Sequence, residues 1–182
     1  MHGVFGEDGS IQSILDKNNI IYNGSMSNSS KNCFDKSFTK KTAKDSNILT
    51  PDFTIVGKKN FNNYNYNFRK SVIKPNKQGS SVGFSIIDDK NKISHALDFA
   101  LEHDTHAIIE EYIEGREITV SILGNDALPI IEIKPNHGIY DYKAKYTQGA
   151  SNYICPADIS ESKSDDIKAV SYTHLTLPTT GV

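Results

Sequence analysis

The chain has 182 residues, 37% hydrophobic and 23% charged, which is ordinary for a folded protein of one or two small domains. Lys and Arg number 20 against 22 Asp and Glu, so the charge gives no reason to expect nucleic acid or a membrane surface as a partner. No apolar run approaches the roughly 18 residues of a membrane helix. Two cysteines, Cys33 and Cys155, cannot form a disulfide framework, and they favour buried thiols in a reducing cytoplasm.

The first part of the chain reads as a loop, a helix and a strand. The glycine-rich stretch HGVFGEDG at 2–9 is typical of a loop that feeds a helix, and apolar spacing predicts that helix over 10–17. IIYNG at 20–24 is predicted to be a short strand. The polar, lysine-rich residues 28–45 carry two phenylalanines four apart, which favours a half-buried helix.

A hairpin is predicted next. DFTIVG at 52–57 is a predicted strand opened by a proline, and the Asn- and aromatic-rich stretch 60–68 is predicted to be a solvated loop. SVIKP at 71–75 and GFSII at 83–87 are then the two arms of a hairpin, joined by a polar Gly-Ser loop.

The clearest amphipathic helix covers residues 91–103, and AIIEEYI at 107–113 is predicted to be a strand. The apolar face of that helix consists of Ile93, Ala96, Leu97, Ala100 and Leu101.

The last part of the chain first alternates between apolar and polar residues and then becomes mostly polar. Residues 116–124 and 127–135 predict an antiparallel pair around a GND turn, followed by a tyrosine- and lysine-rich loop over 136–156. A helix is predicted to start within 162–169. The residues from 170 onward resemble a translated adapter tail and are left out of the fold prediction.

The stretch KPNKQGSSVG at 74–83 raises a choice between a simple turn and a flap that closes over phosphate. Glycine and serine between strand-like runs usually mark only a turn. The stretch is not a P-loop, because its lysine precedes the glycines instead of following them. Taken alone, the composition favours the turn.

Five motifs in one order change that interpretation. HGVFGEDGSIQ, the lysine in CFDK, IKPNKQGSSVG, IIEEYIEGREITV and YDYKAKYTQGASNYICPA span residues 2–157. Together they resemble the D-alanine–D-alanine ligases of the ATP-grasp superfamily. The resemblance implies an α/β (α+β ATP-grasp) fold and an ATP-dependent ligase that joins two D-alanines through an acyl phosphate for peptidoglycan synthesis. Each motif is weak alone, but the ordered set is specific.

The resemblance assigns the phosphate-binding groups. Lys36 and Lys74 match the two lysines on the ATP phosphates, and Lys145 matches a third lysine near the transferred phosphate. The flap that covers the phosphates is then Gly79, Ser80, Ser81, Val82 and Gly83. Without the motifs, each lysine would be interpreted as an ordinary solvated surface charge.

The resemblance also assigns the adenosine-binding groups. Glu110, Glu111, Tyr112 and Ile113 match the segment that passes the adenine, and Glu117 matches the glutamate that holds the ribose hydroxyls. A carboxylate accepts hydrogen bonds from hydroxyl groups, so it suits the sugar better than the phosphate. The alternative is a surface hairpin with an acidic rim.

Substrate contacts follow from the same motifs. His2 matches the histidine that approaches the first D-alanine, and Glu7, Ser80, Tyr140 and Tyr146 are the other expected substrate-binding residues. His2, Ser80, Lys145 and Tyr146 form the expected catalytic set. A tyrosine at 146 goes with dipeptide ligases, which favours an amine as the second nucleophile.

The expected domain division is residues 1–35 as the end of a doubly wound N-terminal domain, 36–117 as the central ATP-grasp subdomain, 118–169 as part of the C-terminal one, and 170–182 as a non-native tail.

The resemblance implies ATP and Mg²⁺ as cofactors, D-alanine as substrate, a cytoplasmic enzyme and a possible homodimer. The magnesium-binding carboxylates do not appear in this sequence, so no metal ligand is assigned and the chain is expected to be an inactive fragment. The alternatives are another ATP-grasp carboxylate–amine ligase, or a nucleotide-binding remnant without chemistry.

Overall fold

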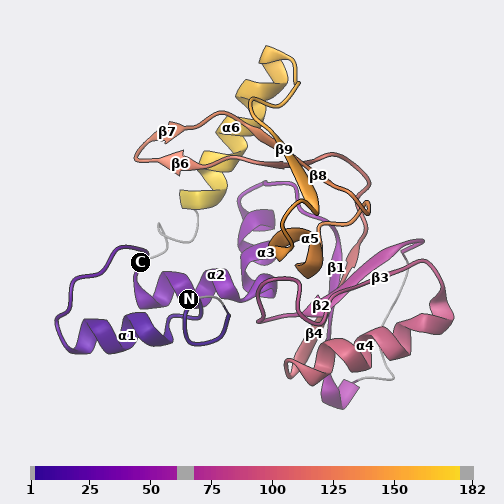
Figure 1. The fold of residues 1–182 in the computed structure, drawn as a ribbon. Helices are drawn as coiled ribbons and strands as arrows, with labels where there is room; N and C mark the ends of the chain where they lie inside the picture. Colours follow the sequence, from indigo (N-terminus) through magenta and orange to yellow (C-terminus); the bar gives the residue numbers. More distant parts are fainter. Residues whose placement is uncertain (1–2, 61–67, 177–182) are drawn as a thin grey trace. The chain divides into compact units, whose positions relative to one another are not determined.

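The computed structural model describes residues 3–60 and 68–176, with side chains omitted at 60 and 174–176 (Figure 1). The chain divides into two compact units, residues 1–113 and 114–182. Each unit has its own sheet and is described by itself.

The first unit is built on a four-stranded antiparallel sheet (Figure 1). Its strands lie in the order β1-β4-β2-β3, so the predicted hairpin β2–β3 forms one side and β4 pairs with both β1 and β2. The prediction of strands at 52–57, 71–75, 83–87 and 107–113 is confirmed within one or two residues at most ends. The strands are β1 (Phe53–Gly57), β2 (Ser71–Pro75), β3 (Ser85–Ile87) and β4 (His106–Glu111).

One face of this sheet packs on α4 (Ile93–Glu102). All five residues of the predicted apolar helix face are buried, and they meet inward side chains of the sheet, including Ile73 and Ile109. Side chains alternate along a strand, so the residues on either side of Ile109, namely Ile108 and Glu110, face away from α4. The register places Lys74 opposite Ile108, which puts Lys74 and Glu110 on the same sheet face.

The N-terminal helices are α1 (Ser10–Lys17), α2 (Ser27–Phe34) and α3 (Lys36–Asp45). The predicted helix over 28–45 is in fact two helices, because the carboxylate of Asp35 accepts from Phe38 N and starts a new helix there. The strand predicted at 20–24 is wrong. Those residues form no strand, and Ile21 is 98% exposed.

The second unit contains a three-stranded antiparallel sheet in the order β5-β8-β9 and a separate two-stranded ribbon, β6–β7. The predicted antiparallel pair over 116–135 is confirmed, although β6 and β7 interrupt it. The strands are β5 (Glu117–Thr119), β6 (Ile122–Leu123), β7 (Asp126–Ala127), β8 (Ile131–Pro135) and β9 (Ser151–Ile154).

Three other sequence predictions need correction. The loop predicted over 136–156 contains a short helix, α5 (Tyr142–Tyr146), and the strand β9. The helix predicted near 162–169 is α6 (Glu161–Thr176), which continues past residue 170. Cys33 and Cys155 are both exposed, so the expectation of buried thiols is wrong. The loop predicted over 60–68 falls largely outside the described residues.

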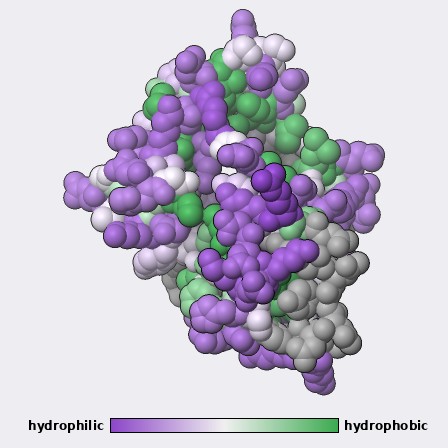
Figure 2. All heavy atoms as spheres, turned by 90° about the vertical axis from the view of Figure 1, so that its right-hand side faces the viewer, coloured by the Kyte–Doolittle hydropathy of each residue, from purple (hydrophilic) through white to green (hydrophobic). Residues whose placement is uncertain are grey.

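Figure 2 shows one face of the molecule, where hydrophilic side chains cover most of the described surface and hydrophobic ones form smaller areas between them. Within residues 3–60 and 68–176, no helix is both long enough and apolar enough to cross a bilayer.

Candidate functional site: a buried carboxylate, three lysines and a flap

A buried carboxylate lies at the centre of the predicted phosphate region. Glu110 is 7% exposed and accepts from two lysines: Lys74 Nζ of the neighbouring strand at 2.5 Å and Lys40 Nζ of α3 at 3.0 Å. Burial acts to raise the pKa of Glu110, but the two ammonium groups outweigh it and hold that pKa below its ordinary value. Glu110 is therefore ionised at neutral pH and fixes both lysines.

Lys36 begins α3 one helical turn before Lys40, and its ammonium reaches the base of the predicted flap. Lys36 Nζ donates to the carbonyl oxygens of Asn76 at 3.3 Å and Gln78 at 2.5 Å. Burial, followed by repulsion from the ammonium of Lys74, lowers the pKa of Lys36 to about 8. The two lysines that the resemblance assigns to phosphate thus lie close enough for the ammonium of Lys74 to act on Lys36.

The flap between β2 and β3 has an unusual backbone. Ser80 and Ser81 have φ values of 52° and 58°, in the left-handed region that residues with a Cβ seldom adopt, and Gly83 has a φ of 68°. Such conformations cost a residue with a Cβ of order 1–3 kcal/mol each, so the cost falls on Ser80 and Ser81, and they gather at ligand clamps. Val82 N donates to Gly79 O at 3.2 Å and closes a tight turn. The simple hairpin turn favoured by composition is therefore a strained loop.

Glu7 lies against the start of this flap. A Cβ built on Gly79 would lie 2.9 Å from Glu7 Oε2, so a larger residue there would displace the carboxylate. The same oxygen accepts from Gly3 N at 2.5 Å, which folds the glycine-rich loop around it. The structure thus brings together two of the predicted groups, Glu7 and the flap. His2 lies outside the described residues.

The predicted adenine segment follows Glu110 along β4. Tyr112 N donates to Lys70 O at 3.0 Å, and the Lys70 ammonium lies 3.8 Å from the centre of the Tyr112 ring. Glu111 and Ile113 line an open cavity of about 860 Å³ whose other walls come from the end of α3 and the loop before β1. The lysine cluster (Lys36, Lys40 and Lys74 with Glu110) does not line that cavity, but Thr50, which accepts from Lys40 Nζ at 2.7 Å, does, so the cavity adjoins the cluster.

In the second unit, the remaining predicted residues cluster around α5. Tyr140 and Tyr153 share a hydrogen bond of 3.1 Å between their hydroxyls, and Lys145 Nζ lies 5.3 Å from the Tyr140 ring centre. That hydrogen bond, then burial and nearby groups that include Glu117 and Tyr146, raise the pKa of Tyr140 to about 12. The phenol therefore stays protonated and remains a donor.

Sequence reasoning missed several residues of this site. Lys40 is only 7% exposed, and its ammonium also donates to Thr50 Oγ1 at 2.7 Å. Its position four residues after Lys36 was an available signal, because residues i and i+4 share a helix face. Asn76 and Tyr153 gave no such signal, since their partners are distant in sequence.

No described residues form a group of three or more His, Cys, Asp or Glu side chains that could hold a metal ion. Magnesium prefers several oxygen ligands, and the one buried carboxylate of the lysine cluster is already paired with two ammonium groups. The described part of the chain therefore does not fit a magnesium site.

Comparison with known proteins identifies the family. The family model described as D-ala D-ala ligase C-terminus matches residues 44–179. A D-alanine–D-alanine ligase of Methylacidiphilum infernorum is 41% identical over 175 residues, covering 96% of this chain and 56% of that relative. The chain thus spans a little over half the length of a curated relative that it matches.

Solved structures agree. A D-alanine–D-alanine ligase from Bacillus anthracis has a TM-score of 0.82 and 33% identity, covering 98% of this chain and 60% of that one. A structure of that ligase complexed with ATP has a TM-score of 0.79 and 29% identity, covering 98% and 57%. The predicted mixed helix-and-sheet ATP-grasp fold is confirmed, and the chain belongs to the D-alanine–D-alanine ligase family, of which it carries the C-terminal family region.

Proposed function

We propose that this chain supplies the nucleotide-binding part of an ATP-dependent ligase that joins two D-alanines into D-alanyl-D-alanine. The observation that carries the proposal is the lysine cluster beside the strained flap. The ammonium groups of Lys40 and Lys74 pair with the buried carboxylate of Glu110, and that of Lys36 lies near them, with the carboxylates of Asp35 and Asp104 also acting on it. The negative charge of a polyphosphate would pair with the ammonium groups of Lys36 and Lys74.

The proposed reaction gives each group a task. The γ-phosphoryl group of ATP passes to the carboxylate of one D-alanine, and the amine of a second D-alanine attacks the acyl phosphate and releases phosphate. Lys36 and Lys74 hold the phosphates, and the backbone N–H groups of the flap close over them. Glu117 holds the ribose, and Lys145 neutralises the transferred phosphoryl group. Within this proposal, Ser80 of the first unit and Tyr146 of the second each contact substrate.

The affinity of the chain for ADP tests the proposed phosphate contacts of Lys36 and Lys74. Changing Lys36 or Lys74 to methionine is expected to weaken ADP binding at least tenfold, because each change removes an ammonium–phosphate contact worth about 1.5–3 kcal/mol. Isothermal titration calorimetry on the full chain measures the effect. The matched control is Lys41→Met, an exposed lysine on the same helix, which should bind within twofold of the unaltered chain. Equal losses in all three variants would contradict the proposal.

The lowered pKa of Lys36 predicts how ADP affinity depends on pH. Bound phosphate favours the charged lysine, so above pH 8 the complex must take up a proton that the free protein has lost. ADP affinity is therefore expected to be level from about pH 7 to 8 and to fall by up to about tenfold per pH unit above 8. Titrations from pH 7 to 9.5 check this.

The control for the pH profile is Lys36→Arg. A guanidinium stays charged throughout that range, so this variant should bind ADP with a level profile. If the arginine variant showed the same fall, Lys36 would not be the titrating group.

A further inference from the structure

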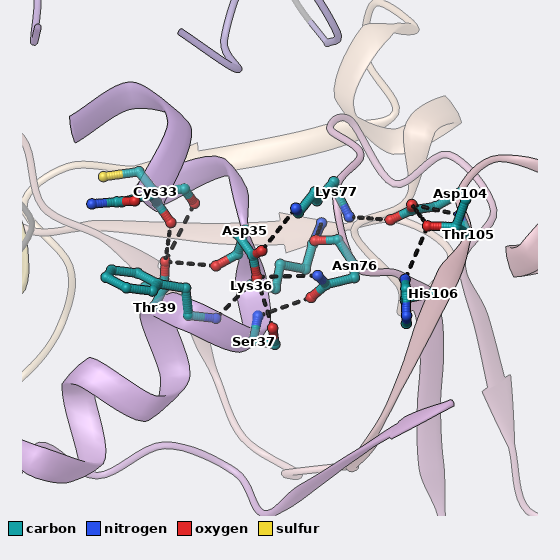
Figure 3. Close-up of polar contacts among 12 residues, drawn as sticks. Cys33, Asp35, Lys36, Ser37, Thr39, Asn76, Lys77, Asp104, Thr105 and His106 are labelled. Carbon is teal, nitrogen blue, oxygen red and sulfur yellow. Dashed lines mark hydrogen bonds and ion pairs between the residues drawn. The ribbon is translucent and has the colours of Figure 1, made fainter. Parts of the chain in front are cut away.

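Asn76 lies between the end of β2 and the flap, and its side chain is almost fully enclosed. It is 5% exposed and belongs to none of the groups assigned above to nucleotide or substrate. Figure 3 shows its side chain directed at the start of α3, where Asp35 and Ser37 lie. All of its polar groups are bonded: N to His106 O at 2.9 Å, O from Lys36 N at 3.2 Å, Oδ1 from Ser37 N at 2.9 Å and Nδ2 to Asp35 Oδ1 at 3.1 Å.

Asp35 is the charged partner in this network. It accepts from Phe38 N at the start of α3, from Ser37 Oγ at 2.7 Å, from Asn76 Nδ2 and, through Oδ2, from Lys77 Nζ at 3.1 Å. Burial acts to raise the pKa of Asp35, but these hydrogen bonds outweigh it and hold that pKa well below its ordinary value. Asp35 therefore remains a carboxylate that accepts hydrogen bonds from both α3 and the segment before the flap.

The same segment also holds the ammonium of Lys36. The carbonyl oxygens of Asn76 and Gln78 accept from Lys36 Nζ, and Gln78 directly precedes the first flap glycine. On the other side, Lys77 N donates to Asp104 Oδ2 at 2.6 Å (Figure 3). Three consecutive residues before the flap are thus fixed between α3 and the loop after α4.

We propose that Asn76 is a positioning residue whose side-chain amide joins the start of α3 to the base of the flap, so that Lys36 and the flap present their donors to phosphate as one preorganised group. The inference rests on the proposed nucleotide function. Preorganised donors bind more tightly because the ordering entropy is lost on folding and not on binding. Asn76 itself touches no ligand in this scheme.

The test compares two substitutions of Asn76 with and without the charge of Asp35. Asn76→Ala removes the side-chain bridge. It is expected to weaken ADP binding about tenfold, because well-made buried hydrogen bonds are lost. Asn76→Asp is expected to cost clearly more, because it sets a carboxylate beside that of Asp35. In the Asp35→Asn background that extra cost should disappear. That dependence would identify the Asp35 carboxylate as the group that the side chain at position 76 faces.

A second readout does not need the nucleotide. Hydrogen exchange of the amides of residues 77–83, measured on the full chain without ligand, is expected to be about tenfold faster in Asn76→Ala. Lys41→Met is the matched control, because it changes an exposed lysine of α3 that none of the bonds described above involves. That variant should bind ADP within twofold of the unaltered chain.

The outcomes separate the two proposals. Faster exchange together with the charge-dependent loss of affinity supports the positioning role. Unchanged exchange and affinity in both Asn76 variants, or equal costs of Asn76→Asp in the two backgrounds, overturns it. If the unaltered chain binds no ADP, the proposed function fails, and the exchange measurement alone still decides whether Asn76 fixes the flap base.

Discussion

Replacing Lys40 with methionine is expected to destabilise the fold by about 2–4 kcal/mol, although Lys40 is one of 20 basic residues in a chain with an ordinary charge balance. The substitution removes an ammonium that is 3.0 Å from Glu110, and both side chains are only 9% exposed. It leaves a buried carboxylate with one partner, Lys74, and a Thr50 hydroxyl without its donor. Removing one member of a buried ion pair typically costs 3–5 kcal/mol, and the remaining lysine reduces that cost.

Chemical denaturation of the full chain measures this change. Lys41→Met is the matched control on the same helix, because Lys41 is exposed and the same methionine is introduced one residue later; its effect should stay within about 0.5 kcal/mol. Adding Glu110→Gln to Lys40→Met should cost less than the two single changes added together, since the amide needs no counter-ion. Strict additivity would show that the pair is not coupled.

The same variant should be more sensitive to acid. The lowered pKa of Glu110 means that its contribution to stability is present above its unfolded value and is lost as pH falls through the folded one. Without Lys40, one of the two ammonium groups that lower the pKa of Glu110 is lost and that pKa rises, so unfolding by acid should begin at a higher pH.

The periodic spacing of apolar residues predicted those helices and strands that bury residues at regular intervals. The apolar face of α4 repeats at helical spacing, and each of its five predicted members is buried. β2 and β3 were equally clear because their arms alternate around a polar turn. β2 carries Lys74, the β2–β3 loop is the flap, and Glu110 lies on β4, another strand that the sequence predicted, so the residues assigned by the resemblance could be placed on the fold.

Predictions from local composition were wrong where a helix depends on a single capping side chain, or where a strand-like stretch has no neighbouring strand to pair with. Residues 20–24 have the β-branched composition of a strand, but a strand is stable only when its backbone pairs with another. α5 has only five residues, too few for periodicity to detect, and it starts where Asp141 Oδ1 accepts from Ala144 N. One aspartate, Asp35, likewise divided a predicted single helix in two.

The missed site residues share a different cause. Asn76 meets Asp35 across 41 positions of sequence, and Lys40 meets Glu110 across 70. The motifs mark residues that the resemblance assigns to a ligand, whereas these residues face one another. Helical spacing places Lys40 on the face of Lys36, but the carboxylate that it meets, like the partner of Asn76, depends on which strands and helices become neighbours.

Replacing Gly83 with alanine is expected to destabilise the flap by about 2–4 kcal/mol and to weaken ADP binding by about tenfold or more. Gly83 is buried with a φ of 68°, a conformation that costs a residue with a Cβ about 1–2 kcal/mol. The added Cβ would also lie 2.8 Å from Pro75 Cγ and 2.8 Å from His103 Cδ2. His103 is exposed and can turn aside, but Pro75 is buried in β2 and holds its place.

Gly124→Ala separates the two causes. Gly124 has a φ of 62°, close to that of Gly83, but a Cβ there meets nothing within 4 Å. Its substitution should therefore cost only the conformational term, about 1–2 kcal/mol, and should leave ADP affinity unchanged. Chemical denaturation measures the loss of stability in both variants, and ADP titration measures the loss of affinity. If Gly83→Ala cost no more than Gly124→Ala, the contact of the added Cβ with Pro75 would not add to the cost of the substitution. Close packing of Gly83 against Pro75 predicts instead that Gly83→Ala costs clearly more than Gly124→Ala.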